Sequence, residues 1–229
     1  MSAAVVFGEE GMSGSDWSPE GLPGFFERLK NMNSIRRFGT IATHHTDSAA
    51  THSYGVAVLA LMIADRQEDP TLNVEAILRK ALWHDFEETI ISDIPHPIKH
   101  RYQGGRLGKL LEEIVETVLD NDAFHELPEQ MARRYAKEAK EAKWGPEGEI
   151  VAAADAMDLV LTATREIKLG NRYFEHIFEA GMGLCERFRH LRLVEEFCGV
   201  ARGYLENGQF VDGIFHENRR AAAQMDLFT

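Results

Sequence analysis

The chain has 229 residues, of which 44% are hydrophobic, so it is long enough to enclose the core of one domain of ordinary size. Its formal net charge of -12 disfavours sequence-independent binding to nucleic acid, which depends on Lys and Arg at the phosphates, but it still allows a small anionic substrate beside a local cation. The two cysteines have no metal-binding spacing, and we expect a reducing, cytoplasmic location without a disulfide framework.

Residues 1–20 mix Gly, Ser and acidic residues without apolar periodicity, and we expect a flexible arm before one folded domain over 21–229. Acidic residues stand where a signal peptide would carry a basic region. No stretch has the continuous apolar length of a bilayer-spanning helix. These features predict a soluble protein that is not exported and has no membrane partner.

From Pro23 onward, apolar residues recur with the period of an α-helix, and no convincing alternating strand is found. Asp47 and Ser48 are suited to cap a helix start, and Gly170 is suited to end one. We therefore predict an all-α protein, a single compact helical bundle. The predicted helices cover residues 23–33, 48–67, 72–92, 106–121, 128–143, 147–169, 172–189 and 191–206, with a short one near 209–219.

Four residues of the kinds that bind metals interrupt apolar or small-residue stretches of these helices. His52 lies in SAATHSYGVAVLALMIA, His84 and Asp85 follow the apolar ILRKALW, and Asp155 lies in IVAAADAMDLVL. A carboxylate among alanines on a core-facing helix is costly to bury unless it is paired or binds a metal. Neighbouring helical side chains point about 100° apart, so His84 and Asp85 can reach one ion. His52 and Asp155 would complete its shell from two other helices.

Two imidazoles and two carboxylates suit one divalent transition metal (Co, Mn, Zn, Fe or Ni) with positions open to water and a substrate oxygen. Such an ion lowers the pKa of bound water and polarises a phosphoryl oxygen. Simpler explanations exist: a buried histidine is often satisfied by one hydrogen bond, and Asp155 could cap a helix or pair with an arginine. Asp158, one turn later, could take its place. The order His, His-Asp, Asp on separate helices favours the metal site.

Three acidic residues follow the His-Asp pair. Glu88 would share the helical face of the preceding aspartate and could accept the proton of the attacking water, whereas Glu87 is expected to face solvent. Asp93 lies where the helix ends, before Pro95, and it could cap a turn or contact a sugar hydroxyl. Its position alone favours the cap.

Arg37 and Phe38 follow the first predicted helix. The planar donor fork of arginine matches phosphate geometry, and the phenyl ring offers a surface to a base or sugar. The alternative is an ordinary helix C-terminus, where a cation favours the dipole and an aromatic ring joins the core. Without a metal site nearby, that alternative is favoured.

Together these segments resemble the HD-domain metal-dependent phosphohydrolases and, more narrowly, the bacterial 5'-deoxynucleotidases. The resemblance rests on RF at 37–38, HS at 52–53, HDFEETIISDIPHPIK at 84–99 and the segment AADAMDLVLTATREIKLGN, and so covers about 37–171. The family usually has Glu before the first His and Trp after the Arg, where this chain has Thr51 and Phe38. We expect residues 40–51 to shape the substrate pocket in their own way.

The resemblance implies a role for each matching residue. Glu88 would activate water, Arg37 would orient the phosphate, and Asp93 would contact the sugar instead of capping a turn. His44 and His45 match no ligand position and are expected to be surface residues or substrate contacts. The implied metal ligands are His52, His84, Asp85 and Asp155. The residues expected to contact substrate are Arg37, Phe38, His52, Asp85, Asp93, Ile94, Pro95 and His96.

The resemblance also implies a homodimeric, divalent-metal-dependent enzyme that removes phosphate from (deoxy)nucleoside 5'-monophosphates. One alternative is a triphosphohydrolase that releases triphosphate from a dNTP, with Lys99, His100 and Arg101 at the polyphosphate. An alternative from another class is a catalytically silent nucleotide-binding regulatory module, against which the presence of Glu88 argues. A helical interaction protein without a metal is the third.

Overall fold

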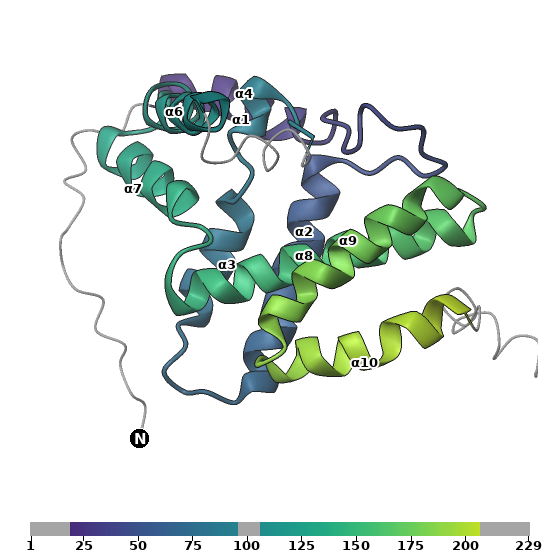
Figure 1. Cartoon of the computed structure of the whole chain (residues 1–229). Helices are drawn as coiled ribbons and strands as arrows, with labels where there is room; N and C mark the ends of the chain where they lie inside the picture. The colour runs from purple at the N-terminus through teal and green to yellow at the C-terminus, as the bar shows by residue number, and fades with distance from the viewer. Residues whose placement is uncertain (1–18, 96–105, 207–229) are drawn as a thin grey trace, which may run out of the picture.

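The computed structural model describes residues 19–95 and 106–206. This part of the chain is helical, and within it the one β-type pairing is an isolated antiparallel bridge between Arg36 and Ser48, so the all-α prediction is confirmed. None of its helices is both long and apolar enough to cross a membrane. The helices, labelled in Figure 1, are α1 (Leu22–Asn31), α2 (Ala49–Gln67), α3 (Val74–Trp83), α4 (Glu88–Ile91), α6 (Arg106–Asn121), α7 (Glu129–Lys140), α8 (Gly145–Lys168), α9 (Glu175–Cys185) and α10 (Arg192–Glu206), with 3-10 turns η1 (Pro19–Gly21), η2 (Arg172–Phe174) and η3 (Glu186–Phe188).

The prediction of one continuous helix over 72–92 was wrong, because α3 and α4 are separate helices. Helix α3 ends at Trp83, and the next hydrogen bonds link residues three apart, from Phe86 N to the Trp83 carbonyl (3.1 Å) and from Glu88 N to the Asp85 carbonyl (3.2 Å). This tighter winding, typical of a 3-10 helix, turns the side chains after Trp83 through a larger angle per residue than an α-helix does. The short helix near 209–219 and most of the predicted arm lie outside the described residues.

The larger hydrophobic core lies where α2 crosses α8, with α3, α9 and α10 packed around the crossing (Figure 1). Both central helices present small, fully buried side chains, Ala60 on α2 and Ala153 and Ala154 on α8. Small side chains allow two helices to approach closely, because less volume separates their backbones. The first turn of α2 and the middle of α8 therefore lie close enough for polar side chains to meet between them.

A second hydrophobic cluster joins α1, α7 and the end of α6 to the chain between α3 and α4. Phe86, fully buried, stacks on Phe124 with ring centroids 4.9 Å apart, and Trp83 meets Phe86 edge-on at 5.2 Å. The ring of Trp83 also stacks on Tyr135 at 4.7 Å. Two aromatic side chains thus anchor the turn on both sides of residues 84 and 85.

Helix α2 is capped by Ser48, one of the two caps that the sequence predicted, and the structure adds a capping box there. The Ser48 side chain accepts a hydrogen bond from the Thr51 backbone N–H, and the Thr51 hydroxyl accepts one from the Ser48 N–H. Helix α8 ends at Lys168 and is followed by Gly170 at φ +96°, a backbone conformation that suits glycine. Both of these predicted helix boundaries are confirmed.

Candidate metal centre

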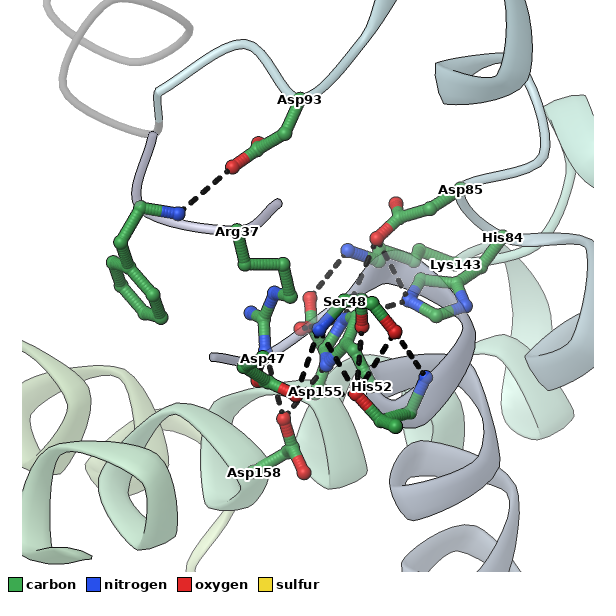
Figure 2. Close-up of polar contacts among 12 residues, drawn as sticks. Arg37, Asp47, Ser48, His52, His84, Asp85, Asp93, Lys143, Asp155 and Asp158 are labelled. Carbon is green, nitrogen blue, oxygen red and sulfur yellow. Dashed lines mark hydrogen bonds and ion pairs between the residues drawn. The ribbon is translucent and has the colours of Figure 1, made fainter. Parts of the chain in front are cut away.

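Four side chains converge where the first turn of α2, the C-terminal end of α3 and the middle of α8 meet (Figure 2). Nε2 of His52 lies 3.2 Å from Nε2 of His84 and 3.4 Å from Oδ2 of Asp85. The same nitrogen lies 3.3 Å from Oδ1 of Asp155. Nε2 of His84 lies 3.1 Å from Oδ2 of Asp85. The structure therefore brings together the four residues that the sequence selected as ligands.

The second nitrogen of each imidazole fixes where its proton lies. Nδ1 of His84 lies 2.7 Å from the carbonyl oxygen of Ala81, and Nδ1 of His52 lies 2.7 Å from Oδ2 of Asp158. Both partners are acceptors, so each neutral ring carries its proton on Nδ1 and a lone pair on Nε2. Both lone pairs then face a carboxylate oxygen of Asp85, and that of His52 also faces Asp155. Such a set of acceptors is satisfied by a cation at its centre.

The spacing of these atoms fits a metal shell. With bonds of about 2.1 Å, neighbouring ligand atoms lie about 3.0 Å apart in an octahedron and about 3.4 Å apart in a tetrahedron. The four distances above, 3.1 to 3.4 Å, fall within that range. Ligand atoms of His52, His84 and Asp85 all lie within 4.8 Å of one another, and Asp155 joins them through His52. The donor set, nitrogen and carboxylate oxygen, suits a divalent transition metal.

The electrostatics of the cluster also favour a cation. Burial and the charge of Arg37 lower the pKa of His52, but hydrogen bonds to its neighbouring carboxylates raise that pKa well above the usual value. Burial raises the pKa of Asp155, yet Lys143 and His52 bring it well below its usual value. The pKa of Asp85 is lowered in the same way against burial, chiefly by His84. The cluster is thus rich in negative charge, and a proton competes with a metal for Nε2 of His52.

Lys143 is a neighbour of this cluster that sequence reasoning missed. It precedes α8, and its Nζ lies 2.5 Å from Oδ2 of Asp155, the oxygen that does not face His52 (Figure 2). Burial lowers the pKa of Lys143, but the carboxylates of Asp155 and Asp85 raise it overall. Its local sequence, AKEAKEAKWG, is that of a charged helix face with several lysines, so nothing in the pattern marks this one.

Asp158 does not compete with Asp155 for the cluster. It lies on the other side of the His52 ring, where Oδ2 approaches both Nδ1 of His52 (2.7 Å) and Nη1 of Arg37 (3.0 Å). Nη1 of Arg37 also donates to Oδ2 of Asp47 at 3.2 Å. Arg37, the predicted phosphate ligand, is thus held by two carboxylates within reach of the metal cluster.

Glu87 and Glu88 are both buried, with 6% and 4% of their surfaces exposed. The expectation that Glu87 faces solvent was therefore wrong, because it assumed that an α-helix continues through this segment. Glu88 opens the first turn of α4, close in the chain to the His-Asp pair. Both glutamates have interaction partners in the structure.

Asp93 and Phe38 contact each other at the edge of the site. The backbone N–H of Phe38 donates to Oδ2 of Asp93 at 3.2 Å. Phe38 adopts a left-handed backbone conformation (φ +58°), which is uncommon for an aromatic residue, and its ring meets Phe174 edge-on at 5.2 Å. Ile94 and Pro95 are half-buried beside them. His96, the remaining predicted substrate contact, lies outside the described residues, as do Lys99, His100 and Arg101.

The segment that carries His44 and His45 is fastened to α8 by one carboxylate. Glu166, only 1% exposed, accepts the backbone N–H groups of His44 (2.8 Å) and His45 (2.7 Å). Asn171 Nδ2 adds a third hydrogen bond at 2.8 Å. Burial raises the pKa of Glu166, but these donors lower it overall. The anchored segment leads directly into Asp47 and the start of α2.

Comparison with known proteins assigns the family. The family model described as 5'-deoxynucleotidase YfbR-like matches residues 24–200. The chain belongs to this family. The 5'-deoxynucleotidase YfbR of Salmonella paratyphi B is 30% identical over 155 residues, which are 66% of this chain and 76% of that protein. The resemblance found in the sequence is therefore confirmed.

Solved structures agree with this assignment. An HD-domain phosphohydrolase from Listeria innocua superposes with a TM-score of 0.71 and 27% identity, over 91% of this chain and 99% of that one. The HD phosphohydrolase DatZ of cyanophage S-2L, bound to dA and one catalytic Zn2+ ion, gives a TM-score of 0.50 and 22% identity over 80% of this chain and 94% of that one. At that identity the likeness to DatZ shows the fold alone.

Proposed function

We propose that the protein is a divalent-metal-dependent phosphohydrolase that releases phosphate from (deoxy)nucleoside 5'-monophosphates. The observation that carries this proposal is the close grouping of two imidazole nitrogens and a carboxylate oxygen, from His52, His84 and Asp85, with Asp155 joining the group through its contact with His52. Membership of the 5'-deoxynucleotidase YfbR-like family supports the choice of substrate. His52, His84, Asp85 and Asp155 would hold the metal.

A divalent ion held by these four side chains would supply Lewis acidity, which would make a water molecule more acidic and, by polarising a phosphoryl oxygen, would make the phosphorus atom more electrophilic. In the proposed reaction the oxygen of water forms a bond to phosphorus, and the bond from phosphorus to the 5'-oxygen breaks. Glu88 accepts a proton from the attacking water, and the departing 5'-oxygen takes up a proton. The products are a nucleoside and phosphate.

Arg37 has the geometry to orient the phosphate. Both of its observed carboxylate contacts use Nη1, and no hydrogen bond from Nε or Nη2 is found among the described residues. The edge formed by Nε and Nη2 can therefore offer two parallel N–H groups to phosphate oxygens. Phe38 and Asp93 adjoin Arg37 and are the proposed contacts to the base and sugar, together with Ile94, Pro95 and His96.

Several finer features are part of the same proposal. The metal is Co, Mn, Zn, Fe or Ni, because all of these bind mixed imidazole and carboxylate shells. The protein works as a homodimer in the cytoplasm, a location consistent with two free cysteines, Cys185 and Cys198. The folded unit spans 21–229 behind a short arm. The substrate is a small nucleotide, because a net charge of -12 disfavours a nucleic acid polymer.

The test is a screen of dNMPs, NMPs and dNTPs against several divalent metals, with separate detection of phosphate, pyrophosphate and triphosphate. We expect orthophosphate from monophosphates, with deoxynucleotides preferred. Release of triphosphate from a dNTP, without phosphate from any monophosphate, would replace the proposal by the triphosphohydrolase alternative. Binding of nucleotides and metal without turnover would support the silent regulatory module. A purified chain that binds no transition metal would support the helical interaction protein.

A further inference from the structure

We propose that Asp158 is a positioning residue that couples the metal ligand His52 to the phosphate-orienting Arg37. The part that concerns phosphate rests on the function proposed above. Asp158 has no counterpart among the roles that the family resemblance assigns, and it lies on α8 one turn after Asp155. One carboxylate would thus contact both a metal ligand and the residue that orients the phosphate.

The geometry is that of a shared acceptor. A single oxygen, Oδ2 of Asp158, lies 2.7 Å from Nδ1 of His52 and 3.0 Å from Nη1 of Arg37 (Figure 2). The side chains of His52 and Arg37 are 1% and 13% exposed, so water screens these contacts little. Both contacts are charge-assisted hydrogen bonds, which are shorter and stronger than neutral ones.

Helix α2 leaves space for this carboxylate. A Cβ atom built on Gly55 would lie 2.7 Å from Oδ1 of Asp158, closer than real Cβ atoms approach an oxygen. Glycine in the interior of a helix is less favourable than alanine, so its presence here fits a need for room. Gly55 follows His52 by three residues, hence it lies beside the ring on the same side of the helix.

The contact has opposite consequences for its two partners. By accepting the Nδ1–H of His52, Asp158 keeps the Nε2 lone pair directed at the cluster and makes the imidazole a stronger metal ligand. For Arg37 the same carboxylate adds a second negative charge beside the guanidinium, in addition to Asp47. It fixes the orientation of Arg37 but reduces its attraction for phosphate. Asp158 should therefore strengthen metal binding and moderate phosphate binding.

Two substitutions separate these effects. Asp158→Asn keeps an oxygen that can accept hydrogen bonds from both partners but removes the charge. Asp158→Leu has a side chain of similar size and removes both hydrogen bonds. Asp65→Asn removes one charge from an exposed position of α2 and serves as the matched control. Metal affinity is measured by titrating the metal-free full-length protein with Zn2+ and with Mn2+. Phosphate affinity is measured by titrating the metal-loaded protein with inorganic phosphate, at equal metal occupancy.

We expect Asp158→Leu to weaken metal binding about 10- to 100-fold and Asp158→Asn to weaken it less. Inorganic phosphate should bind Asp158→Asn as tightly as the wild type, or more tightly, while Asp65→Asn changes neither affinity. The proposal is overturned if metal affinity is unchanged in both variants, or if Asp158→Asn loses metal and phosphate affinity in equal proportion. If Asp158→Leu does not fold, Asp158→Asn alone decides. Neither titration requires turnover. A wild type that hydrolyses no nucleotide would therefore refute the proposed function but would not change the conclusion about Asp158.

Discussion

Nδ1 of His84 lies 2.7 Å from the carbonyl oxygen of Ala81, three residues earlier in the chain. The carbonyl oxygen accepts a hydrogen bond from Nδ1–H of the neutral ring, so the lone pair of Nε2 is presented to the cluster. His125 makes the same local contact, with Nδ1 2.7 Å from the Asp122 carbonyl, but it is exposed and is not a member of the His52, His84 and Asp85 group. The two histidines thus share a backbone interaction and differ in what Nε2 faces.

This pair gives a matched test of metal binding. Removal of a ligand should cost more than the 10- to 100-fold loss of affinity that is typical of an outer contact, so we expect His84→Ala to bind metal more than about 100-fold more weakly. His125→Ala should bind metal like the wild type. Metal content after dialysis and Zn2+ titration provide the measurement. Equal affinity in the two variants would remove His84 from the proposed shell.

Gly55→Ala should weaken metal binding although alanine favours a helix. The new methyl group would meet Oδ1 of Asp158 at 2.7 Å and push the carboxylate away from His52. We expect a loss of about tenfold in Zn2+ affinity, the lower end of the effect of an outer contact. In an Asp158→Ala background the methyl group has nothing to displace, so the same substitution should change affinity little. Additive losses in the double variant would show that Gly55 acts by another route.

Phe86→Leu should weaken metal binding more than Phe124→Leu. The two rings stack on each other and are 0% and 1% exposed, so both substitutions should destabilise the protein to a similar extent, by about 1 to 3 kcal/mol. Phe86, however, adjoins Asp85 and anchors the turn that carries it. Thermal unfolding in the absence of metal, together with Zn2+ titration, separates stability from affinity. Parallel losses of affinity would mean that the aromatic cluster supports the fold without positioning the turn.

Glu166→Gln should lower stability in a pH-dependent way. Glu166 accepts N–H groups from His44 and His45, and an amide side chain leaves one of them facing another donor, at a cost of about 1 to 3 kcal/mol. The pKa of Glu166 is lowered in the folded state, so its carboxylate contributes stability above its unfolded pKa of about 4.3, and that contribution is lost as the pH falls through the folded value.

The difference in unfolding free energy between wild type and Glu166→Gln should therefore be constant near pH 7 and shrink below about pH 4. Urea unfolding at several pH values measures it. Glu179→Gln, which removes an exposed carboxylate bound to Arg202, is the control and should cost less than about 1 kcal/mol. A stability difference for Glu166→Gln that grows on acidification would contradict a lowered pKa of Glu166 in the folded state.

The sequence predicted the all-α fold and selected the four clustered residues because polar groups stand out in apolar helices. It placed Glu87 in solvent because the helical period was extended past Trp83, where the backbone winds more tightly. Asp158 was an alternative to Asp155 as the metal ligand, because residues three apart lie nearly one turn apart on the same side of a helix. Only the crossing of α2 over α8 shows that one faces Nε2 of His52 and the other Nδ1. Such a difference depends on packing, which periodicity does not encode.

The most direct measurement of the central claim is phosphate release from dAMP by protein stripped with a chelator and then reconstituted with Mn2+, Co2+ or Zn2+. We predict no release from the stripped protein and equimolar nucleoside and phosphate after reconstitution. Glu88→Gln should retain metal but turn over about 10²- to 10⁴-fold more slowly, while Glu75→Gln, an exposed glutamate of α3, should behave like the wild type. Undiminished phosphate release from fully metal-free protein would contradict the proposed metal-dependent hydrolysis.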